Sequence, residues 1–298
     1  AGAPVAAHWV GDRQTGASLL RYGTEAQKQL LMPRMAAGEI FFAIGMSEPG
    51  SGSDLASVRT RAQKVDGGWA ITGTKLWTSN AHRADYFFIL CRTSAVDEKH
   101  RHAGLSQFII DLRNTPGIHI RPVPILTGAH HFNEVVLESA FVPDDMVLGA
   151  IGNGWEQVTS ELAFERSGPE RFMSTFPLLQ EAVRVFGPNP EPHVAQVLGE
   201  LVAQLWALRR MSLSVAGALD RGEAPDVAAA LVKDLGTLFE SEVFERIRLL
   251  YDAAPSLTAR RQIDVFLAQA VLHSPGFTLR GGTNEILRGV VARALGLR

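Results

Sequence analysis

The sequence is short of several features that would point to particular classes of protein. Cys91 is the single cysteine, so no disulfide forms within the chain, which suits a reducing compartment and predicts a cytoplasmic location. No apolar run approaches the roughly 18 residues of a membrane span, so no membrane span is expected. The 29 basic and 31 acidic residues nearly cancel, which leaves no positive field to attract nucleic acid or anionic lipid.

Common catalytic motifs are also absent. The sequence has no GxGxxG, Walker loop, HExxH or GxSxG pattern and no metal-spaced Cys/His cluster, which argues against those enzyme classes. The pair His130-His131 is interpreted as solvated rather than metal-binding. The first residues, Ala-Gly-Ala-Pro-Val, include neither an initiator Met nor a signal-peptide pattern, so we expect the chain to begin mid-sequence.

What is present is an ordinary globular composition in a chain of 298 residues, for which about 150 residues per domain predicts two domains. The pattern of apolar and turn-forming residues changes twice along the chain. Residues 1–40 favour helix, residues 41–150 contain short apolar runs separated by turns, and residues 151–298 return to helical periods. These patterns predict an α+β protein in which a mainly antiparallel β-domain, a barrel or sandwich, precedes a helical bundle.

The helical regions also carry start and stop signals. Thr24 is a candidate cap for a helix over 24–31, and residues 35–38 suggest a short helix stopped by Gly38. Residues 155–186 form one helical block that we expect to break at Gly168-Pro169. Later helices are expected over 193–219, 226–250 with Asp226 as its cap, 262–272 and 284–295.

Four segments carry more specific patterns, each with an ordinary structural alternative that stays open. Residues 47–54 (Ser-Glu-Pro-Gly-Ser-Gly-Ser-Asp) suit a polar ligand edge or a plain Gly/Ser connection. Residues 73–80 (Gly-Thr-Lys-Leu-Trp-Thr-Ser-Asn) suit an indole laid on a flat cofactor or a core Trp. Residues 164–166 (Phe-Glu-Arg) place Glu165 either on a buried helix face, where a carboxylate needs a partner or a function, or on a solvated face. In residues 280–288 two glycines precede a Thr-capped helix, which suits an anion or polar ligand or is an ordinary loop with a cap.

Taken together and in this order, the segments resemble the acyl-CoA dehydrogenase family of flavoproteins. The resemblance runs from Gly23 to the C-terminus, and Val142 to Gly149 is similar to the segment that closes the family's β-domain. It implies a helical N-terminal domain, a central β-domain and a C-terminal four-helix bundle, commonly in tetramers. Under that reading residues 1–40 are the tail of the first domain, residues 41–150 the second and residues 151–298 the third, with most of the N-terminal domain missing before Ala1.

The resemblance also implies a cofactor and a reaction. FAD would accept the β-hydrogen as hydride while a carboxylate removes the α-proton of an acyl-CoA, and electron-transferring flavoprotein would reoxidise the flavin. The residues that match the family's flavin contacts are Ile44, Gly45, Met46, Ser47 to Ser53 with Gly52, Trp77, Thr78, Ser79, Thr283, Asn284 and Glu285. Ser53, Arg166 and Gly282 match positions near the substrate.

The catalytic carboxylate departs from the commoner family pattern. Most members place a Glu just before Gly-Thr in the C-terminal loop, where this sequence has Gly281. A subset places it immediately before the retained arginine, which here is Glu165 before Arg166. Glu165 is therefore the predicted base, and the Gly281 N–H is the predicted donor to the thioester oxygen.

Two contacts that family members donate to a neighbouring subunit's FAD are also absent. Val183 stands where many members have Arg before Phe-Gly, with Arg184 one position away, and the Gln-x-x-Gly-Gly segment is missing. These losses suggest an α2β2 heterotetramer with a partner subunit, or a homo-oligomer that binds FAD weakly. An active dehydrogenase, a non-catalytic subunit of such a complex, and another flavin reaction such as oxidation with oxygen all remain open.

Overall fold

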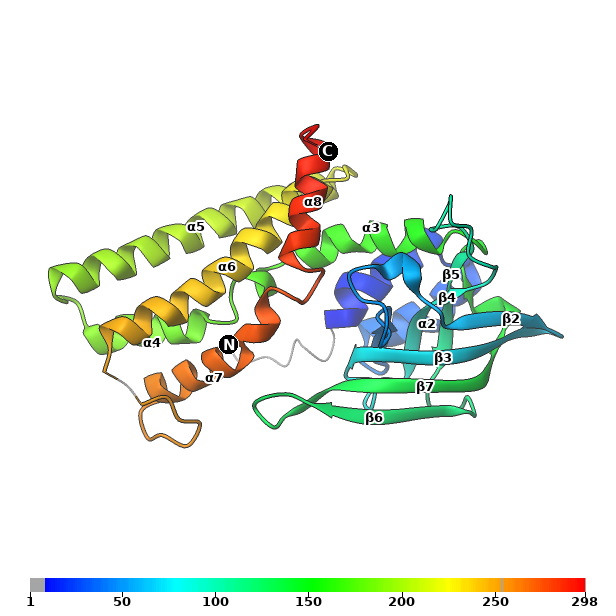
Figure 1. Cartoon of the computed structure of the whole chain (residues 1–298), viewed down its shortest axis with the longest axis horizontal. Coiled ribbons are helices and arrows are strands. Elements are labelled where there is room, and N and C mark those ends of the chain that lie inside the picture. The colour runs from blue at the N-terminus through cyan, green and yellow to red at the C-terminus, as the bar shows by residue number, and fades with distance from the viewer. Residues whose placement is uncertain (1–8, 253, 298) are drawn as a thin grey trace. The chain divides into compact units, whose positions relative to one another are not determined.

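The computed structural model describes residues 9–252 and 254–297, apart from the side chains of 161–163. Residues 1–5, on which the expectation of a missing start depended, lie outside the described residues. The described chain separates into two compact units, residues 1–161 and 162–298. Each unit is described by itself below (Figure 1).

The first unit begins with helices and continues into a sheet. Its helical elements are the π-helical turn η2 (Gly11–Thr15), α1 (Gly16–Tyr22), α2 (Glu25–Ala36), the 3-10 turns η3 (Leu55–Ser57) and η4 (Asp144–Met146), and the start of α3 (Gly154–Arg166). Its strands are β1 (Phe42–Gly45), β2 (Arg61–Val65), β3 (Gly68–Ser79), β4 (Tyr86–Arg92), β5 (Leu105–Asp111), β6 (Ile118–Pro124), β7 (His130–Pro143) and β8 (Val147–Leu148).

The helix predicted at Thr24 forms as expected at its start. The Thr24 hydroxyl accepts from the Gln27 N–H at 3.2 Å, and the Gln27 side chain accepts from the Thr24 N–H at 3.0 Å, which is a capping box. The separate short helix expected over 35–38 was wrong, because α2 continues through Pro33 to Ala36. Gly38, at a φ of 73°, lies just beyond its end.

The sheet is mainly antiparallel, as predicted. The strand order is β6-β7-β3-β2-β4-β5-β8, and β1 pairs in parallel with β4. A single parallel pairing also joins β2 to β4 through Arg61 and Arg92. Figure 1 shows β6, β7, β3 and β2 as adjacent strands. The central strands β4 and β5 are almost continuously buried, since both of their faces are covered by apolar side chains.

The second unit is a helical bundle built from long helices. It contains the end of α3, the 3-10 turn η5 (Pro169–Arg171), α4 (Phe176–Phe186), α5 (Pro192–Asp220), α6 (Asp226–Leu250), α7 (Gln262–Phe277) and α8 (Asn284–Ala294). One apolar core joins α4, α5, α6 and α7, which matches the predicted four-helix bundle (Figure 1). No helix in the described ranges is long and apolar enough to cross a bilayer.

Several predicted helix boundaries agree closely with the structure and two differ. The helical block breaks at Gly168-Pro169, and α6 spans the predicted residues. Asp226 is not the cap of α6, because Pro225 occupies that position and Asp226 is already helical. The helix α7 runs to Phe277 through Pro275 rather than stopping at Leu272, since its apolar face continues into the bundle core.

Candidate functional site

The candidate flavin-binding residues of the first unit lie on two segments that hydrogen bonds tie together. Residues 47–53 follow β1, and residues 77–79 end β3. The Leu76 N–H donates to the Ser47 carbonyl at 2.9 Å. The Glu48 and Ser51 backbones bond each other in both directions, which closes the Gly/Ser segment into a tight loop. The structure thus brings together two of the segments that the sequence singled out.

A buried ion pair holds the same two segments. The Lys75 ammonium donates to the Met46 carbonyl at 3.0 Å and to a Glu48 carboxylate oxygen at 2.9 Å. The Glu48 carboxylate also accepts from the backbone N–H groups of Arg59 and Thr60. Burial raises the pKa of Glu48. Lys75 and these hydrogen-bond donors together lower it by more than burial raises it, so the net shift is downward.

Glu48 lies in the run Ser47 to Ser53 that the sequence matched to the flavin contacts, whereas Lys75 was not named as a site residue. Strand alternation puts Lys75 on the same face as the buried Ile71, and that was the available signal. Gly45 belongs to the same packing, because a Cβ there would lie 2.2 Å from the Phe87 ring and 3.0 Å from Lys75 Cγ. Gly45 therefore lets β1 lie against these two side chains.

Trp77 occupies a bulge at the end of β3. The register shifts between Lys75 and Thr78, and Trp77 has a φ of 62°, which is uncommon for a bulky residue. Its indole is 54% exposed and meets Phe132 edge-on at 5.7 Å. Strained backbone that presents a large exposed aromatic is typical of a ligand-contacting position.

A polar cluster supports the residue after Trp77. Asn133, fully buried on β7, donates to the Thr78 carbonyl at 2.9 Å. The Asn133 side-chain oxygen bonds His82 at 3.1 Å and His130 at 2.7 Å, and the two histidine rings stack at 3.9 Å. His130 therefore belongs to this cluster and starts β7 instead of lying in a loop, while its side chain is exposed to solvent as expected. Burial lowers the pKa of His82, and the neighbouring His130 lowers it further.

These residues fit the edge of a flat, polar heterocycle such as the FAD isoalloxazine. A Cβ at Gly52 would meet open space, so the loop leaves room beside its backbone. The Thr78 hydroxyl is buried and has no hydrogen-bond partner in the described residues. Ser47 and Ser79 are half-buried hydroxyls, while Ser53 is exposed. Ile44 and Met46 are partly buried and pack against two different apolar clusters.

The candidate catalytic residues of the second unit also lie close together. A Cβ built on Gly281 would lie 3.0 Å from each carboxylate oxygen of Glu165. Arg166 Nε donates to the Gly281 carbonyl at 3.2 Å. Gly281 has a φ of 70° and Gly282 a φ of 87°, conformations that favour glycine. The Glu165 carboxylate thus occupies the space beside the glycine that stands in the commoner position of the base.

An arginine outside the predicted set contacts Glu165 directly. Arg171, on η5, donates to the Glu165 carbonyl at 3.1 Å and forms a buried ion pair with its carboxylate. No sequence spacing indicated this contact, because the chain breaks at Gly168 between the two residues. The identification of Arg166 as the neighbour of the base was therefore incomplete.

A buried lysine anchors the loop that carries Gly281. Lys233, on α6, donates to the Thr278 carbonyl at 2.9 Å and to the Asn284 side-chain oxygen at 2.6 Å. Burial, with a smaller effect of Arg171, lowers the pKa of Lys233 to about 8. Asn284 is almost fully buried and also accepts from Thr237, so its side chain is committed to internal contacts.

The remaining loop residues shape the start of α8. The Thr283 hydroxyl accepts from the Ile286 N–H at 3.4 Å, as the predicted cap requires. Glu285 is exposed in the first turn, where hydrogen bonds from its own backbone N–H and from Thr283 lower its pKa. The backbone N–H groups in the first turn of α8, beside Glu285, suit contact with a polar ligand.

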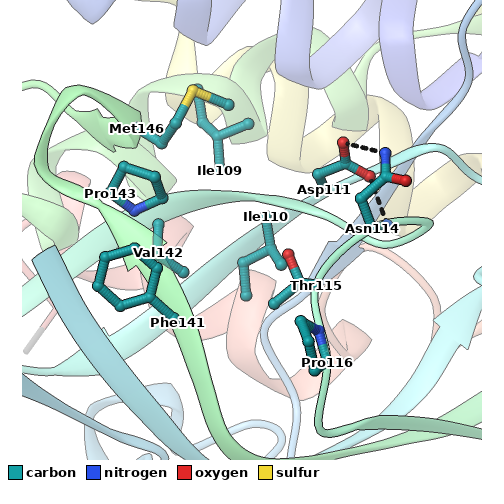
Figure 2. A pocket seen from close by; sticks show the side chains of 10 residues that line it. All are labelled: Ile109, Ile110, Asp111, Asn114, Thr115, Pro116, Phe141, Val142, Pro143 and Met146. Carbon is teal, nitrogen blue, oxygen red and sulfur yellow. Dashed lines mark hydrogen bonds between the residues drawn. The ribbon is translucent and has the colours of Figure 1, made fainter.

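The pockets found in the two units lie elsewhere. One of about 250 Å³ is mostly apolar and lies between the ends of β5 and β7 (Figure 2). Another of about 430 Å³ lies between α4 and α7 beside Glu181 and Arg184. Neither contains a predicted catalytic or flavin-edge residue. No group of three or more His, Cys, Asp or Glu side chains in the described residues is placed to hold a metal ion.

Comparison with known proteins gives the same family in both halves of the chain. Residues 43–140 match the acyl-CoA dehydrogenase middle domain, and residues 178–296 match the acyl-CoA dehydrogenase C-terminal domain. The chain is 37% identical over 283 residues to acyl-CoA dehydrogenase FadE34 of Mycobacterium tuberculosis, covering 94% of this chain but only 38% of FadE34. It is 32% identical to acyl-CoA dehydrogenase IpdE1 of the same organism, covering 100% of this chain and 77% of IpdE1.

A solved structure supports the assignment. The Tcur3481-Tcur3483 steroid ACAD superimposes with a TM-score of 0.85 at 29% identity, covering 97% of this chain and 76% of that one. Sequence and fold agree on the family. The chain therefore belongs to the acyl-CoA dehydrogenase family of FAD-dependent oxidoreductases.

Proposed function

We propose that the protein is an FAD-dependent dehydrogenase that converts an acyl-CoA thioester into a trans-2-enoyl-CoA. The observation that carries this proposal is the Glu165 carboxylate against the backbone of Gly281. A general base and a backbone donor beside one another are the two groups that removal of an α-proton from a thioester requires.

The chemistry of the chain's own residues follows from that arrangement. Glu165 takes the α-proton, so the α C–H bond breaks and an O–H bond forms on the carboxylate. The Gly281 N–H donates to the thioester oxygen and stabilises the negative charge that develops there. When bound, FAD supplies the acceptor for the β-hydrogen and its electron pair. Arg166 holds the Gly281 carbonyl and with it the orientation of the peptide.

The flavin would be held by the segments of the first unit described above. Trp77, Thr78 and Ser79 would contact the ring, and the loop 47–53 would contact its polar edge. Thr283 and Glu285 are the residues of the second unit that we assign to cofactor contacts. Asn284 would act indirectly by keeping the loop in place, because its side chain bonds Lys233 and Thr237. Ser53 and Gly282 are assigned to the substrate.

The acyl group is proposed from the solved relative. That protein is described as a steroid ACAD, so a CoA thioester of a steroid-derived acid is the first substrate to test. Branched and straight-chain acyl-CoAs complete the panel. Electron-transferring flavoprotein is the proposed natural oxidant. A cytoplasmic location stays a prediction.

The protein is further proposed to function with a different partner subunit in an α2β2 assembly. Arg184, the nearest candidate for the missing FAD contact, is paired with Glu181 through bonds of 2.8 and 2.5 Å. Val183, at the expected arginine position, carries no charge. The solved relative is named for two polypeptides, which supports a heteromeric arrangement. Stoichiometric FAD in the protein purified alone would contradict an obligate partner.

The decisive experiment replaces the base. Glu165→Gln is expected to abolish enoyl-CoA formation with an artificial electron acceptor while FAD stays bound, because the amide cannot accept the α-proton. The matched control is Glu200→Gln, which removes a carboxylate paired with Arg246 at 2.5 Å on the bundle surface. Near-normal turnover in Glu165→Gln would show that Glu165 is not the base, and absence of turnover in the wild type would favour a non-catalytic subunit.

A further inference from the structure

Arg171 is fixed to Glu165 at two points. Its Nε donates to the Glu165 backbone carbonyl at 3.1 Å, and a terminal nitrogen pairs with carboxylate oxygen Oε1. The two side chains are only 4% and 7% exposed. Because the first bond fixes the guanidinium relative to the main chain, the second fixes the direction of the carboxylate.

The other carboxylate oxygen is left for another partner. Glu165 Oε2 is buried and makes no hydrogen bond to any described residue. Both oxygens lie 3.0 Å, and Arg171 Cζ lies 3.3 Å, from the position of a Cβ on Gly281. The glycine therefore leaves room for the ion pair as a unit, with Oε1 committed to Arg171 and Oε2 unpaired.

The charges around Glu165 come from three elements. Arg166 on α3 and Lys233 on α6 each interact with Glu165 through space, and Asp234 lies beside Lys233. Burial lowers the pKa of Arg166 and of Lys233. Arg171 on η5 is the cation in direct contact with the carboxylate. A buried carboxyl without such a partner takes up a proton and cannot act as a base at neutral pH.

We propose that Arg171 is the positioning residue of the catalytic base: it keeps Glu165 ionised, occupies Oε1 and leaves Oε2 to accept the substrate proton. This inference depends on the proposed function, because the ionisation of Glu165 matters to turnover only if Glu165 is the base. Arg171 itself touches neither the reacting atoms nor the cofactor in this proposal.

The first test is the pH profile of turnover in the FAD-loaded protein, using the acyl-CoA panel. Arg171→Met is expected to shift the acidic limb of kcat upward by at least one pH unit. At pH values below the limb, kcat should fall about tenfold for each unit of that shift, with recovery as the pH rises. Arg171→Lys should shift the acidic limb of kcat less than Arg171→Met does, because the lysine keeps a positive charge. An unchanged limb in Arg171→Met would overturn the proposal.

Controls separate this proposal from the proposed function. Arg261→Met removes an arginine that pairs with the buried Asp264 at 2.7 Å, and it should leave the pH profile unchanged. Glu165→Gln should be inactive at every pH. If Glu165→Gln is active, the proposed function fails, whereas an inactive Glu165→Gln beside a normal pH profile in Arg171→Met overturns only the role of Arg171.

A second readout needs no turnover. Without Arg171, the ionised Glu165 carboxylate is buried with no cation in direct contact, and this cost grows with the ionised fraction, so stability falls as the pH increases. The urea midpoint of Arg171→Met, compared with that of Arg171→Met/Glu165→Gln, should therefore decrease between pH 5.5 and 8. Parallel pH curves for the two variants would overturn the proposal. If Arg171→Met does not fold, the same comparison is made with Arg171→Lys.

Discussion

The Lys75 ammonium and the Glu48 carboxylate form an ion pair of 2.9 Å in which the two side chains are 0% and 7% exposed. The pair joins the strand that ends in Trp77 to the loop over residues 47–53. Lys75 also donates to the carbonyl of Met46, so one side chain links three parts of the candidate flavin-binding surface.

Replacing this lysine should therefore destabilise the first unit. Lys75→Met leaves Glu48 as a buried charge that only the N–H groups of Arg59 and Thr60 partly satisfy. The expected loss is about 3 kcal/mol in the free energy of unfolding by urea, with reduced FAD retention. Lys64→Met is the control, because Lys64 pairs with Asp144 while both side chains are 53% exposed, and it should cost under about 1 kcal/mol. Equal losses in both variants would contradict the role assigned to Lys75.

A methyl group at Gly281 should affect turnover more than stability. The φ of 70° costs an alanine about 1 kcal/mol, and the new Cβ would press on both oxygens of Glu165 at 3.0 Å. We expect Gly281→Ala to lower kcat at least tenfold. Gly222→Ala is the matched control, since Gly222 has a φ of 76° and open space around it. It should lose the same stability but keep its kcat, and a similar kcat in both variants would refute the steric argument.

Lys233 predicts a stability difference at alkaline pH. Its pKa falls from 10.5 to about 8 in the folded protein, mainly through burial. Between these values the unfolded chain binds more protons, so this lysine makes stability rise with pH. Relative to Lys233→Met, the wild type should gain about 1–2 kcal/mol between pH 7.5 and 9.5 in urea unfolding. Lys64→Met should follow the wild type in parallel, and a Lys233→Met curve that also runs parallel would rule out the lowered pKa.

Local signals in the sequence were sufficient for much of the secondary structure. The Thr24 capping box and the helix over 226–250 formed where predicted, because caps and helical periods act over a few residues. The predicted cap at Asp226 failed because Pro225 already occupies the cap position. The end of α7 was misplaced because packing in the bundle core carries the helix through Pro275. In these two places the neighbouring residue and the tertiary contacts outweighed the local signal.

The candidate site likewise contains residues that the sequence indicated and residues that only the structure revealed. The motifs at 47–53, 77–79, 165–166 and 281–285 identified the family and the candidate base from residue identity alone. Arg171, Lys75 and Lys233 were not recognised, since contacts across a broken helix, between a strand and a loop or between a helix and a loop have no fixed spacing in the chain. Their roles appear only when burial and distance are known.

The sequence by itself determined the α+β class, the mainly antiparallel sheet followed by a bundle, and Glu165 as the candidate base. Periodicity, caps and short motifs record interactions between residues that are close in the chain. Only the tertiary structure decided which charges are buried together, because the energy of an ionised group depends on the distance and burial of all its neighbours. That is why the sequence could name Glu165 as a candidate, whereas its ion-pair partner Arg171 appeared only in the fold.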